Sequence, residues 1–486
     1  MKLVFPGIAD LIHISPLIAL FLCSLIPITI KIFRGNKEQP AVATLIQGLI
    51  GIAISLALLL VFGGTGQTAF ADNLIFDGLT YWSGFIALSA AALSLFLMYE
   101  NPSTTGDQFS ELTFLTLNSA LGMLILTSAT DLLIIFIGLE LMSLSLYLMI
   151  GMSHEEKLSK EAAFKYFILG SFASAIFLYG TAFIFGTAKT TNILAIMEQS
   201  PDLMETHKLY LFGIVLIMLG YCFKVSLAPF HAWTPDVYQG APTPISAYMA
   251  TAIKCVSFTS FLRVVLTGSV ISSVHLFDIL QWIAVITMLV GNTAAIIQGN
   301  LKRMLAYSSI AHSGYILIGV IAAGVSQEPS FASTGVLYYL LSYSLMTLGA
   351  FAMVALMERS ENEIVNIDDL AGFSKRHPIL ALCFTIFLLS LAGIPPTVGF
   401  FGKFYVFSSA IAEGLIWLTV WGVINSVISV YYYLRPIVVM YMKDGDSVVA
   451  THSLHATKGT IVATAILIII LGLTSGALFE LVQNTL

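Results

Sequence analysis

About fourteen apolar runs, most of them near 20 residues long, divide this chain and restrict its fold more than any other feature. A helix of about 20 apolar residues spans the hydrocarbon core of a bilayer. Charged residues make up only 10% of the chain, whereas a soluble domain carries about 25%. The sequence therefore predicts an all-α transmembrane protein with about fourteen helices. We place the runs at residues 11–33, 41–63, 80–98, 111–128, 130–151, 166–186, 209–229, 242–270, 276–298, 304–324, 334–357, 379–408, 412–440 and 459–482.

The polar connectors between these runs are short, and the longest are residues 187–208, 358–378 and 441–458. None of them is long enough to fold as a separate domain, so we interpret residues 1–486 as a single polytopic membrane domain. The first run ends in Lys31 and Arg34 and lacks a small-residue cleavage site. This pattern favours a retained helix over a signal peptide.

Basic residues are distributed unequally between the two sets of loops, which predicts the orientation in the membrane. The less basic side carries only Lys2, Lys189 and Lys208. Because the basic side of a membrane protein faces the cytoplasm, we predict that both termini lie on the non-cytoplasmic side. The more basic side carries Lys31, Arg34, Lys37, Lys157, Lys160, Lys165, Lys302, Arg303, Arg359, Lys375, Arg376, Arg435, Lys443 and Lys458.

The order of the runs indicates an internal repeat. Runs four to eight (111–270) and nine to thirteen (276–440) form two five-helix units, and the fourth helix of each unit carries both proline and a buried lysine. Five is an odd number, so successive units have opposite orientations in the membrane, as in the inverted repeats of many transporters.

Few features indicate a cofactor. Cys23, Cys222, Cys255 and Cys383 all lie in apolar runs and form no CxxC pair, so we interpret them as packed thiols rather than zinc or iron–sulfur ligands. No nucleotide-binding glycine loop follows a strand, and no basic cluster indicates nucleic acid. We predict no cofactor and no metal in this chain.

Four ionisable residues lie well inside apolar runs, namely Glu140, Lys224, Lys254 and Lys403. Each charge at the bilayer centre costs about 2.5–3.5 kcal/mol on insertion scales, so these groups must pair, face water or titrate. A static ion pair between Glu140 and one lysine is the simplest alternative. It leaves at least two lysines without a carboxylate, unless Asp131 reaches inward from its helix end. A buried amine without a carboxylate releases its proton more easily, and the set therefore favours proton transfer.

Prolines close to two of these lysines predict interrupted helices. Pro229 cannot donate the amide hydrogen bond to the carbonyl of Val225, next to Lys224. Pro395 and Pro396 likewise free the carbonyls of Leu391 and Ala392, ahead of Lys403. Irregular backbone at membrane depth is tolerated where it lines water or packed protein. An ordinary proline kink is the alternative interpretation.

Other titratable residues have both a structural and a functional interpretation. His231 and His312 are flanked by Ser, Thr or Tyr, which is typical of a proton relay, although a lone helical histidine is often a packing residue. Glu161 and Lys165 are spaced as a surface helix pair, with proton uptake from solvent as the alternative. Asp131 opens a run, where it acts as an N-cap or belongs to the same uptake route. Arg263 lies near a helix end, from which it can reach the surface.

Three stretches resemble the antiporter-like subunits of respiratory complex I, and most closely the N-type subunit of bacterial NADH-quinone oxidoreductase. They are FKVSLAPFHAWTPDVYQGAPTPIS (223–246), KRMLAYSSIAHSGY (302–315) and LAGIPPTVGFFGKFYVF (391–407). The DVYQGAP segment, lysine rather than glutamate at 403, and the lack of a long lateral helix favour type N over types M and L. The resemblance covers about residues 75–440, and earlier residues match in hydropathy only.

This resemblance implies fourteen helices with inverted repeats in helices 4–8 and 9–13, and with helices 7 and 12 broken. It implies that Glu140, Lys224, Lys254, Lys403, His231 and His312 occupy the proton-translocating positions. It also implies a bacterial inner membrane location, with subunits M, K and J as neighbours. NAD, FMN, iron–sulfur clusters and quinone are then expected in partner subunits. Alternatives are a subunit of a multisubunit cation/proton antiporter or membrane-bound hydrogenase, a stand-alone solute transporter, and a structural membrane scaffold.

Overall fold

The computed structural model describes residues 7–34, 39–101, 104, 106, 108–152, 157–266, 274–358, 365–445 and 454–486. Lys37, Arg359 and the last four residues of the 242–270 run lie outside the described residues. The described part is almost entirely helical, as the apolar runs predict. Its elements are α1 (Ile8–His13), α2 (Ser15–Arg34), α3 (Ala41–Phe62), β1 (Gln67–Ala69), β2 (Leu74–Phe76), α4 (Gly78–Glu100), α5 (Phe109–Ser128), α6 (Leu132–Gly151), α7 (Lys157–Ala188), α8 (Ile193–Thr206), α9 (Lys208–Lys224), α10 (Trp233–Gly240), α11 (Thr243–Tyr248), η1 (Met249–Ile253), α12 (Lys254–Leu266), α13 (Val274–Ile296), α14 (Leu301–Val325), α15 (Ser330–Met357), η2 (Ile367–Leu370), α16 (Phe373–Arg376), α17 (Pro378–Ala392), α18 (Val398–Ala412), α19 (Ile416–Met442), α20 (His455–Leu473) and α21 (Ser475–Gln483).

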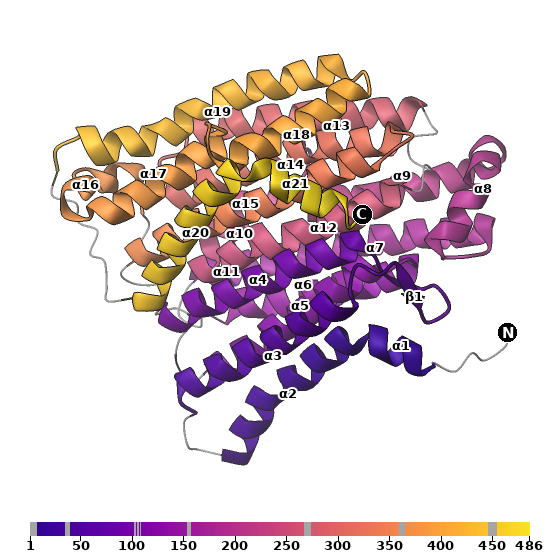
Figure 1. Ribbon diagram of the computed structural model, residues 1–486, viewed down its shortest axis with the longest axis horizontal. Helices are drawn as coiled ribbons and strands as arrows, with labels where there is room; N and C mark the ends of the chain where they lie inside the picture. Colours follow the sequence, from indigo (N-terminus) through magenta and orange to yellow (C-terminus); the bar gives the residue numbers. More distant parts are fainter. Residues whose placement is uncertain are drawn as a thin grey trace.

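The long helices lie side by side as one bundle (Figure 1). Among the described residues, twelve helical spans are long and apolar enough to cross a membrane, and α17 and α18 are shorter apolar helices. Helices α2 and α3 lie along one edge of the bundle and α19 along the opposite edge. These edge helices expose large apolar side chains, such as Val61 on α3 and Val427 on α19. An apolar outer surface is what a bilayer solvent requires.

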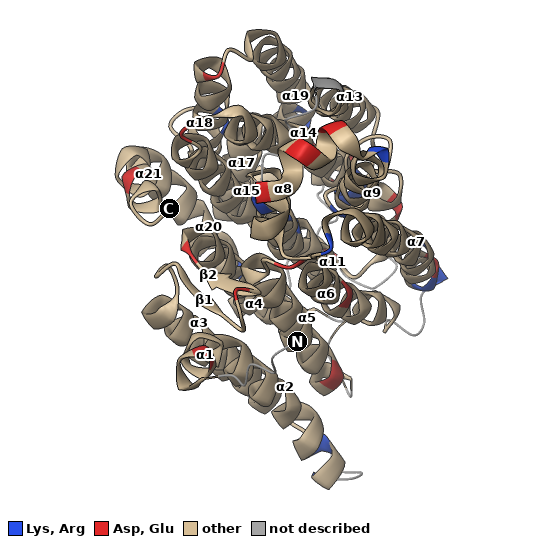
Figure 2. Cartoon of the chain, turned by 90° about the vertical axis from the view of Figure 1, so that its right-hand side faces the viewer, with Lys and Arg blue, Asp and Glu red and all other residues tan. Residues whose placement is uncertain are grey.

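The centre of the bundle is formed by α11, η1, α12, α14 and α15, whose side chains are almost all buried. Helix α15 packs against α14, α18, α17 and α20. Viewed along the bundle, charged residues are sparse among the helices (Figure 2). The buried charges discussed below therefore stand in a predominantly apolar interior.

Several helix boundaries differ from those that hydropathy predicts. The first run forms α1 and α2, and the last run forms α20 and α21. Helix α7 begins at Lys157 rather than near residue 166, because its polar first turns continue the helix beyond the apolar segment. Runs 209–229 and 379–408 are each interrupted, as described below.

Several elements in the connectors were not predicted, and η2 and α16 in the 358–378 connector are among them. Strands β1 and β2 form a short antiparallel hairpin between α3 and α4, and α8 lies in the 187–208 connector. The carbonyl of Asp72, in the hairpin turn, accepts hydrogen bonds from Thr130 Oγ1 and Asn192 Nδ2. The hairpin thus ties together the α5–α6 and α7–α8 connections, at the end of the bundle where α1 and the C-terminus lie (Figure 1).

Helix α4 holds the last helices of the chain at both ends. The Glu100 carboxylate accepts hydrogen bonds from the backbone amides of Ala456 and Thr457, at the start of α20. A carboxylate is favourable at a helix N-terminus. At the opposite end, Trp82 Nε1 donates to Thr485 Oγ1 over 2.6 Å. These contacts fix α20 and α21 against α4, beside the central helix α15.

Candidate functional site

The helix interruption near Lys224 is stabilised by contacts from other helices. Helix α9 ends at Lys224 and α10 begins at Trp233. The helix stops one residue before Val225, whose carbonyl Pro229 was predicted to free, because Ser226 adopts a left-handed conformation with φ 61°. The amide of Ala228 donates to Thr287 Oγ1 on α13, and Trp233 Nε1 donates to the Phe223 carbonyl. Polar backbone groups of the interruption are thus satisfied within the protein.

The second interruption separates α17 from α18 at residues 393–397, which contain Pro395 and Pro396. The Lys403 amine donates to the carbonyls of Leu391 and Ala392 over 3.2 and 3.0 Å, the two carbonyls that the prolines were predicted to free. It also donates to Ser426 Oγ over 2.9 Å. The amine of Lys403 therefore lies at the carbonyl end of α17, where a positive charge is favoured.

Glu140 and Lys224 lie close together but form no ion pair within 4.0 Å among the described residues. Lys224 Nζ instead donates to Ser143 Oγ over 2.6 Å. Ser143 follows Glu140 by one turn on α6 and donates its own hydroxyl to the Leu139 carbonyl. One buried carboxylate oxygen of Glu140 has no hydrogen-bond partner in the described part of the chain. The static ion pair considered from the sequence is not present in this conformation.

Lys254 is the first residue of α12 and directly follows the π-helical turn η1. Such turns widen a helix and are frequent at functional sites. Lys254 Nζ donates to the carbonyl and the hydroxyl of Ser309 on α14, over 2.7 and 2.5 Å. Tyr343 on α15 also donates to the Ser309 hydroxyl, over 2.8 Å. The amine is thus held between three helices by uncharged oxygens.

His312 connects this group with the region around Lys403. It follows Ser309 by three residues on α14 and is buried. Its Nδ1 is 2.7 Å from the Tyr339 hydroxyl and its Nε2 is 3.1 Å from the Tyr433 hydroxyl. Lys403 Nζ lies 4.8 Å from the ring centroid of Tyr315, one turn further along α14. Both ring nitrogens of His312 therefore have hydroxyl partners, as a proton relay requires.

A family comparison identifies what kind of protein carries this arrangement. Residues 129–429 match the family described as NADH:quinone oxidoreductase/Mrp antiporter, TM. The chain is 65% identical to NADH-quinone oxidoreductase subunit N of Bdellovibrio bacteriovorus, over 99% of each chain. It is 41% identical to subunit N of Trichlorobacter lovleyi, over 89% of this chain and 88% of that one.

This chain belongs to the subunit N family of NADH-quinone oxidoreductases.

Solved structures have the same fold as this member of the subunit N family. A chain of respiratory complex I from Thermus thermophilus superimposes with a TM-score of 0.82 and 31% identity, covering 96% of this chain and 98% of that one. A chain of the Mrp complex from Dietzia superimposes with a TM-score of 0.83 and 17% identity, covering 97% and 96%. At that identity the second likeness shows the fold alone.

The remaining predicted residues lie outside the row of contacts just described. His231 lies in the turn between α9 and α10, half-buried, and its Nδ1 has no hydrogen-bond partner among the described residues. Asp131 caps α6 by accepting from the amides of Leu133 and Ile134, and its second oxygen accepts from Thr191. Asp131 therefore has the local geometry of an N-cap.

Glu161 and Lys165 belong to a larger charged cluster than the sequence indicated. Lys165 Nζ contacts Glu161 over 2.7 Å and Asp236 over 3.0 Å. Asp236 on α10 is also 2.9 Å from Arg303 on α14. The cluster joins α7, α10 and α14 beside the interruption that follows Lys224. It lies at the opposite end of the bundle from Asp131, since Asp131 caps the start of α6, and α7 begins six residues after α6 ends at Gly151.

Arg263 was expected to reach the surface, but its side chain stays inside the bundle. It is 9% exposed and forms an ion pair with Asp77. A long side chain near a helix end reaches outward only when no partner lies closer, and here a carboxylate faces it from the start of α4.

Sequence reasoning missed the residues that connect the charged groups in this subunit N chain. They are uncharged and of types that are common in membrane helices, so they gave no signal of their own. A spacing of three residues from Glu140 to Ser143 and from Ser309 to His312 was the only available pattern. These residues are Ser143, Ser309, Tyr315, Tyr339, Tyr343, Ser426 and Tyr433.

Replacing Glu161 with glutamine is expected to change NADH-driven proton pumping by less than about twofold. The pair with Lys165 is exposed on both sides, and such pairs contribute only about 0–1 kcal/mol. Lys165 retains Asp236 as a partner after the substitution. Pumping by the assembled enzyme in proteoliposomes measures the effect, and a large loss would make Glu161 part of the uptake route.

Proposed function

We propose that the chain translocates protons in the membrane arm of an NADH:quinone oxidoreductase, and that Glu140, Lys224, Lys254, His312 and Lys403 carry them. The supporting observation is the environment of the three lysines. Their exposed fractions are 5, 2 and 4%, and among the described residues each amine donates to uncharged oxygens rather than to a carboxylate. A buried amine with neutral partners can give up its proton without separating an ion pair.

The first step of the proposed mechanism is a change at Glu140. When the ionised carboxylate approaches Lys224, the ammonium form is stabilised; when it withdraws or is neutralised, the lysine releases its proton. The unpartnered oxygen of Glu140 supports this step, because no hydrogen bond holds that atom in place. Ser143 keeps the amine of Lys224 close to α6 in either state.

The proton then passes from Lys224 to the neutral amine of Lys254. From there the Ser309 and Tyr343 hydroxyls lead to His312, which accepts a proton on one ring nitrogen and releases another from the second. Lys403 receives it beside Tyr315. The Tyr339 and Tyr433 hydroxyls on the two sides of His312 support proton transfer through its ring.

Proton uptake is assigned to Lys165, Asp236 and Arg303, with His231 between these residues and Lys224. The partly exposed Lys165 and Asp236 side chains support access from the solvent. The half-buried His231 lies in the loop that begins directly after Lys224. Asp131 is not part of this route, because it caps α6 at the other end of the bundle.

The energy for translocation comes from electron transfer in other subunits. Moving one proton against the membrane potential costs about 2.3 kcal/mol per 100 mV. We assign NAD, FMN, iron–sulfur clusters and quinone to partner subunits, with subunits M, K and J as the neighbours in the membrane arm. Cys222, Cys255 and Cys383 are buried free thiols, which supports a structural rather than a redox role for them.

We further propose that residues 111–270 and 276–440 are inverted repeats in a bacterial inner membrane protein. Helix α6 packs on α5, and α9 on α7; in the second half, α14 packs on α13, and α17 on α15. Helix α1, near the start of the described residues, and the C-terminus lie at the same end of the bundle (Figure 1). This supports a topology with both termini on one side of the membrane, and the excess of basic residues in the opposite set of loops favours the non-cytoplasmic side for them. The fourteen-helix count follows if α9 with α10, and α17 with α18, each cross the membrane as one broken helix.

A subunit of a multisubunit cation/proton antiporter or membrane-bound hydrogenase is the alternative assignment. The full-length likeness to subunit N of Bdellovibrio bacteriovorus favours the NADH-quinone oxidoreductase. Copurification from native membranes distinguishes the two, because only the proposed assignment brings down an NADH-oxidising complex.

Replacing Glu140 with glutamine tests the proposed function directly. The amide keeps the size of the side chain but removes the charge that stabilises the Lys224 ammonium. We expect NADH-driven proton pumping to fall several-fold while the complex still assembles. The measurement is pumping per NADH oxidised in proteoliposomes, with Glu161→Gln as the matched control. Equal pumping by both variants would refute the role of Glu140.

A further inference from the structure

The ion pair between Arg263 and Asp77 is a buried charge pair that the proposed relay does not use. The two guanidinium NH2 groups donate to the two carboxylate oxygens over 2.7 and 2.8 Å. Arg263 also donates to Thr80 Oγ1 and to the Thr127 carbonyl. Burial alone raises the pKa of Asp77, but the Arg263 charge and the hydrogen bonds hold it below its ordinary value. The pair is therefore fully charged near neutral pH.

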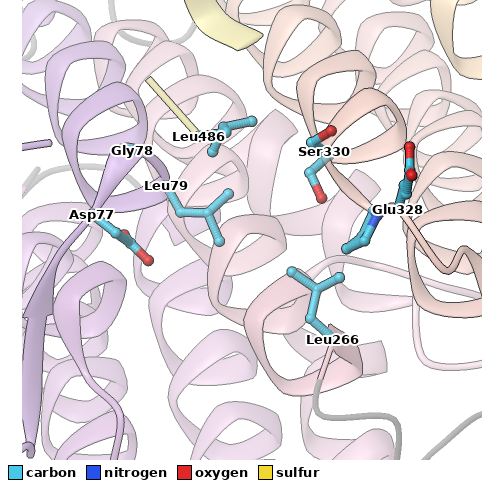
Figure 3. Close-up of a pocket in the computed structure, with 9 residues that line it drawn as sticks. Asp77, Gly78, Leu79, Leu266, Glu328, Ser330 and Leu486 are labelled. Atoms are coloured by element: carbon cyan, nitrogen blue, oxygen red, sulfur yellow. The ribbon is translucent and has the colours of Figure 1, made fainter. Parts of the chain in front are cut away.

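A pocket of about 440 Å3 borders the Asp77 side of this pair. Asp77 and Leu79 line one wall, and Glu328 and Ser330 line the opposite wall (Figure 3). The pocket is located at the end of the bundle where α1 and the C-terminus lie. The pocket is bordered by the Glu328 carboxylate, the Ser330 hydroxyl and the Asp77 carboxylate of the ion pair.

On the inner side of the pair, hydroxyl groups follow α12 back toward Lys254. Ser257 and Ser260 come three and six residues after Lys254, and Arg263 comes nine residues after it, about 13 Å along the helix axis. Ser260 Oγ is 2.7 Å from the Tyr221 hydroxyl. Ser257 Oγ is buried and has no hydrogen-bond partner among the described residues. A buried hydroxyl that is left with unused hydrogen-bonding capacity is unusual and calls for a partner.

We propose that these hydroxyls form a proton outlet from Lys254, and that the Arg263–Asp77 pair is its seal. A fixed guanidinium in a narrow polar path opposes the passage of protons, while Asp77 neutralises the pair so that it can remain buried. The seal opens when the two groups separate. Water from the pocket then reaches Ser260 and Ser257.

The proton balance of the open state is simple. The Lys254 ammonium loses one proton and becomes a neutral amine, and water takes that proton into the pocket, which the Asp77 and Glu328 carboxylates line. Lys224 then recharges the amine of Lys254. This step rests on the proposed function, since it requires Lys254 to carry protons. It gives the chain a release point between its two halves, because α4 and α12 belong to the first half and α15 to the second.

Passive proton leak in the absence of NADH tests the seal without requiring turnover. The double variant Asp77→Asn/Arg263→Gln removes both charges together, so no unpaired charge is left buried. Asparagine also remains a good N-cap for α4. We expect passive proton flux into proteoliposomes under an imposed potential to rise about tenfold. Adding Ser257→Ala to the double variant should return the flux to the wild-type level.

The matched control is Asp368→Asn/Lys443→Gln, an exposed ion pair with a 3.0 Å separation, which should leave the leak unchanged. A double variant that assembles normally but shows wild-type leak overturns the proposal, as does a leak that persists with Ser257→Ala. A different result would contradict the proposed relay itself: the Glu140 and Lys224 variants would then pump protons normally with NADH.

A labelling experiment applies if the double variant does not assemble. The thiol introduced by Ser257→Cys should react with a membrane-impermeant thiol reagent during NADH turnover, and not in the resting enzyme. Modification at equal rates in both states, or in neither, contradicts a seal that opens during turnover.

Discussion

Proton pumping by the assembled complex is expected to fall more than about tenfold when Lys224 is replaced by methionine, the largest effect in the first half of the chain. Methionine fills nearly the same volume as lysine but carries no proton. The relay is then broken between Glu140 and Lys254. The initial rate of NADH-driven acidification in proteoliposomes measures the effect, and the amount of assembled complex is determined in parallel.

The loss should not reflect damage to the fold. Ser143 still donates to the Leu139 carbonyl in the variant, so the substitution leaves only one acceptor lone pair without its partner. Ser143→Ala is the matched control, because it removes the hydrogen bond to Lys224 but keeps the amine. We expect a clearly smaller loss in that control. Near-normal pumping by Lys224→Met would show that protons bypass this position.

The lysines were predictable from the sequence because their energetic signal is large. A lysine at the bilayer centre costs about 2.5–3.5 kcal/mol, and an apolar run contains few residues that compete with that signal. Lys224, Lys254 and Lys403 are indeed buried within the bundle. The interruptions were predictable for a similar reason, since proline has no amide to donate. The prolines also predicted that the carbonyls of Leu391 and Ala392 would be free, and the Lys403 amine donates to both of them.

The partners of the lysines could not be predicted, because they come from distant parts of the chain. Ser143 is 81 residues from Lys224, and Tyr433 is 121 residues from His312. A serine hydroxyl can bond a carbonyl of its own helix, and tyrosine is largely apolar, so neither residue type carries a penalty that would single it out. The surface interpretation of Arg263 was wrong for the same reason, since Asp77 lies 186 residues away.

A common electrostatic feature links the two interrupted helices. Lys224 is the last residue of α9, and the Lys403 amine contacts the last carbonyls of α17. In both halves a buried lysine therefore lies at the negative end of a half-helix, whose free carbonyls favour positive charge by about 0.3–2 kcal/mol. That support is well below the cost of an isolated buried ion. The carbonyls therefore lower the free-energy cost of the charged lysine but do not make the charge permanent. Reversible protonation requires this balance.

Lys403→Arg is expected to reduce pumping more than about tenfold, even though the substitution preserves the charge. Arginine has more donors than lysine and can still bond the carbonyls of Leu391 and Ala392, so the structure around the interruption is retained. A guanidinium does not lose its proton in proteins, and the relay cannot discharge through it. NADH-driven pumping in proteoliposomes is again the measurement.

The matched control for this substitution is Ser426→Ala, which removes one of the three acceptors of the Lys403 amine and leaves its protonation chemistry intact. We expect that variant to lose less than about half of its pumping, because the Leu391 and Ala392 carbonyls still hold the amine. If Lys403→Arg pumps as well as Ser426→Ala, a permanent positive charge is sufficient at this position. Lys403 would then stabilise the interrupted helix electrostatically, and the protons would follow another path from His312.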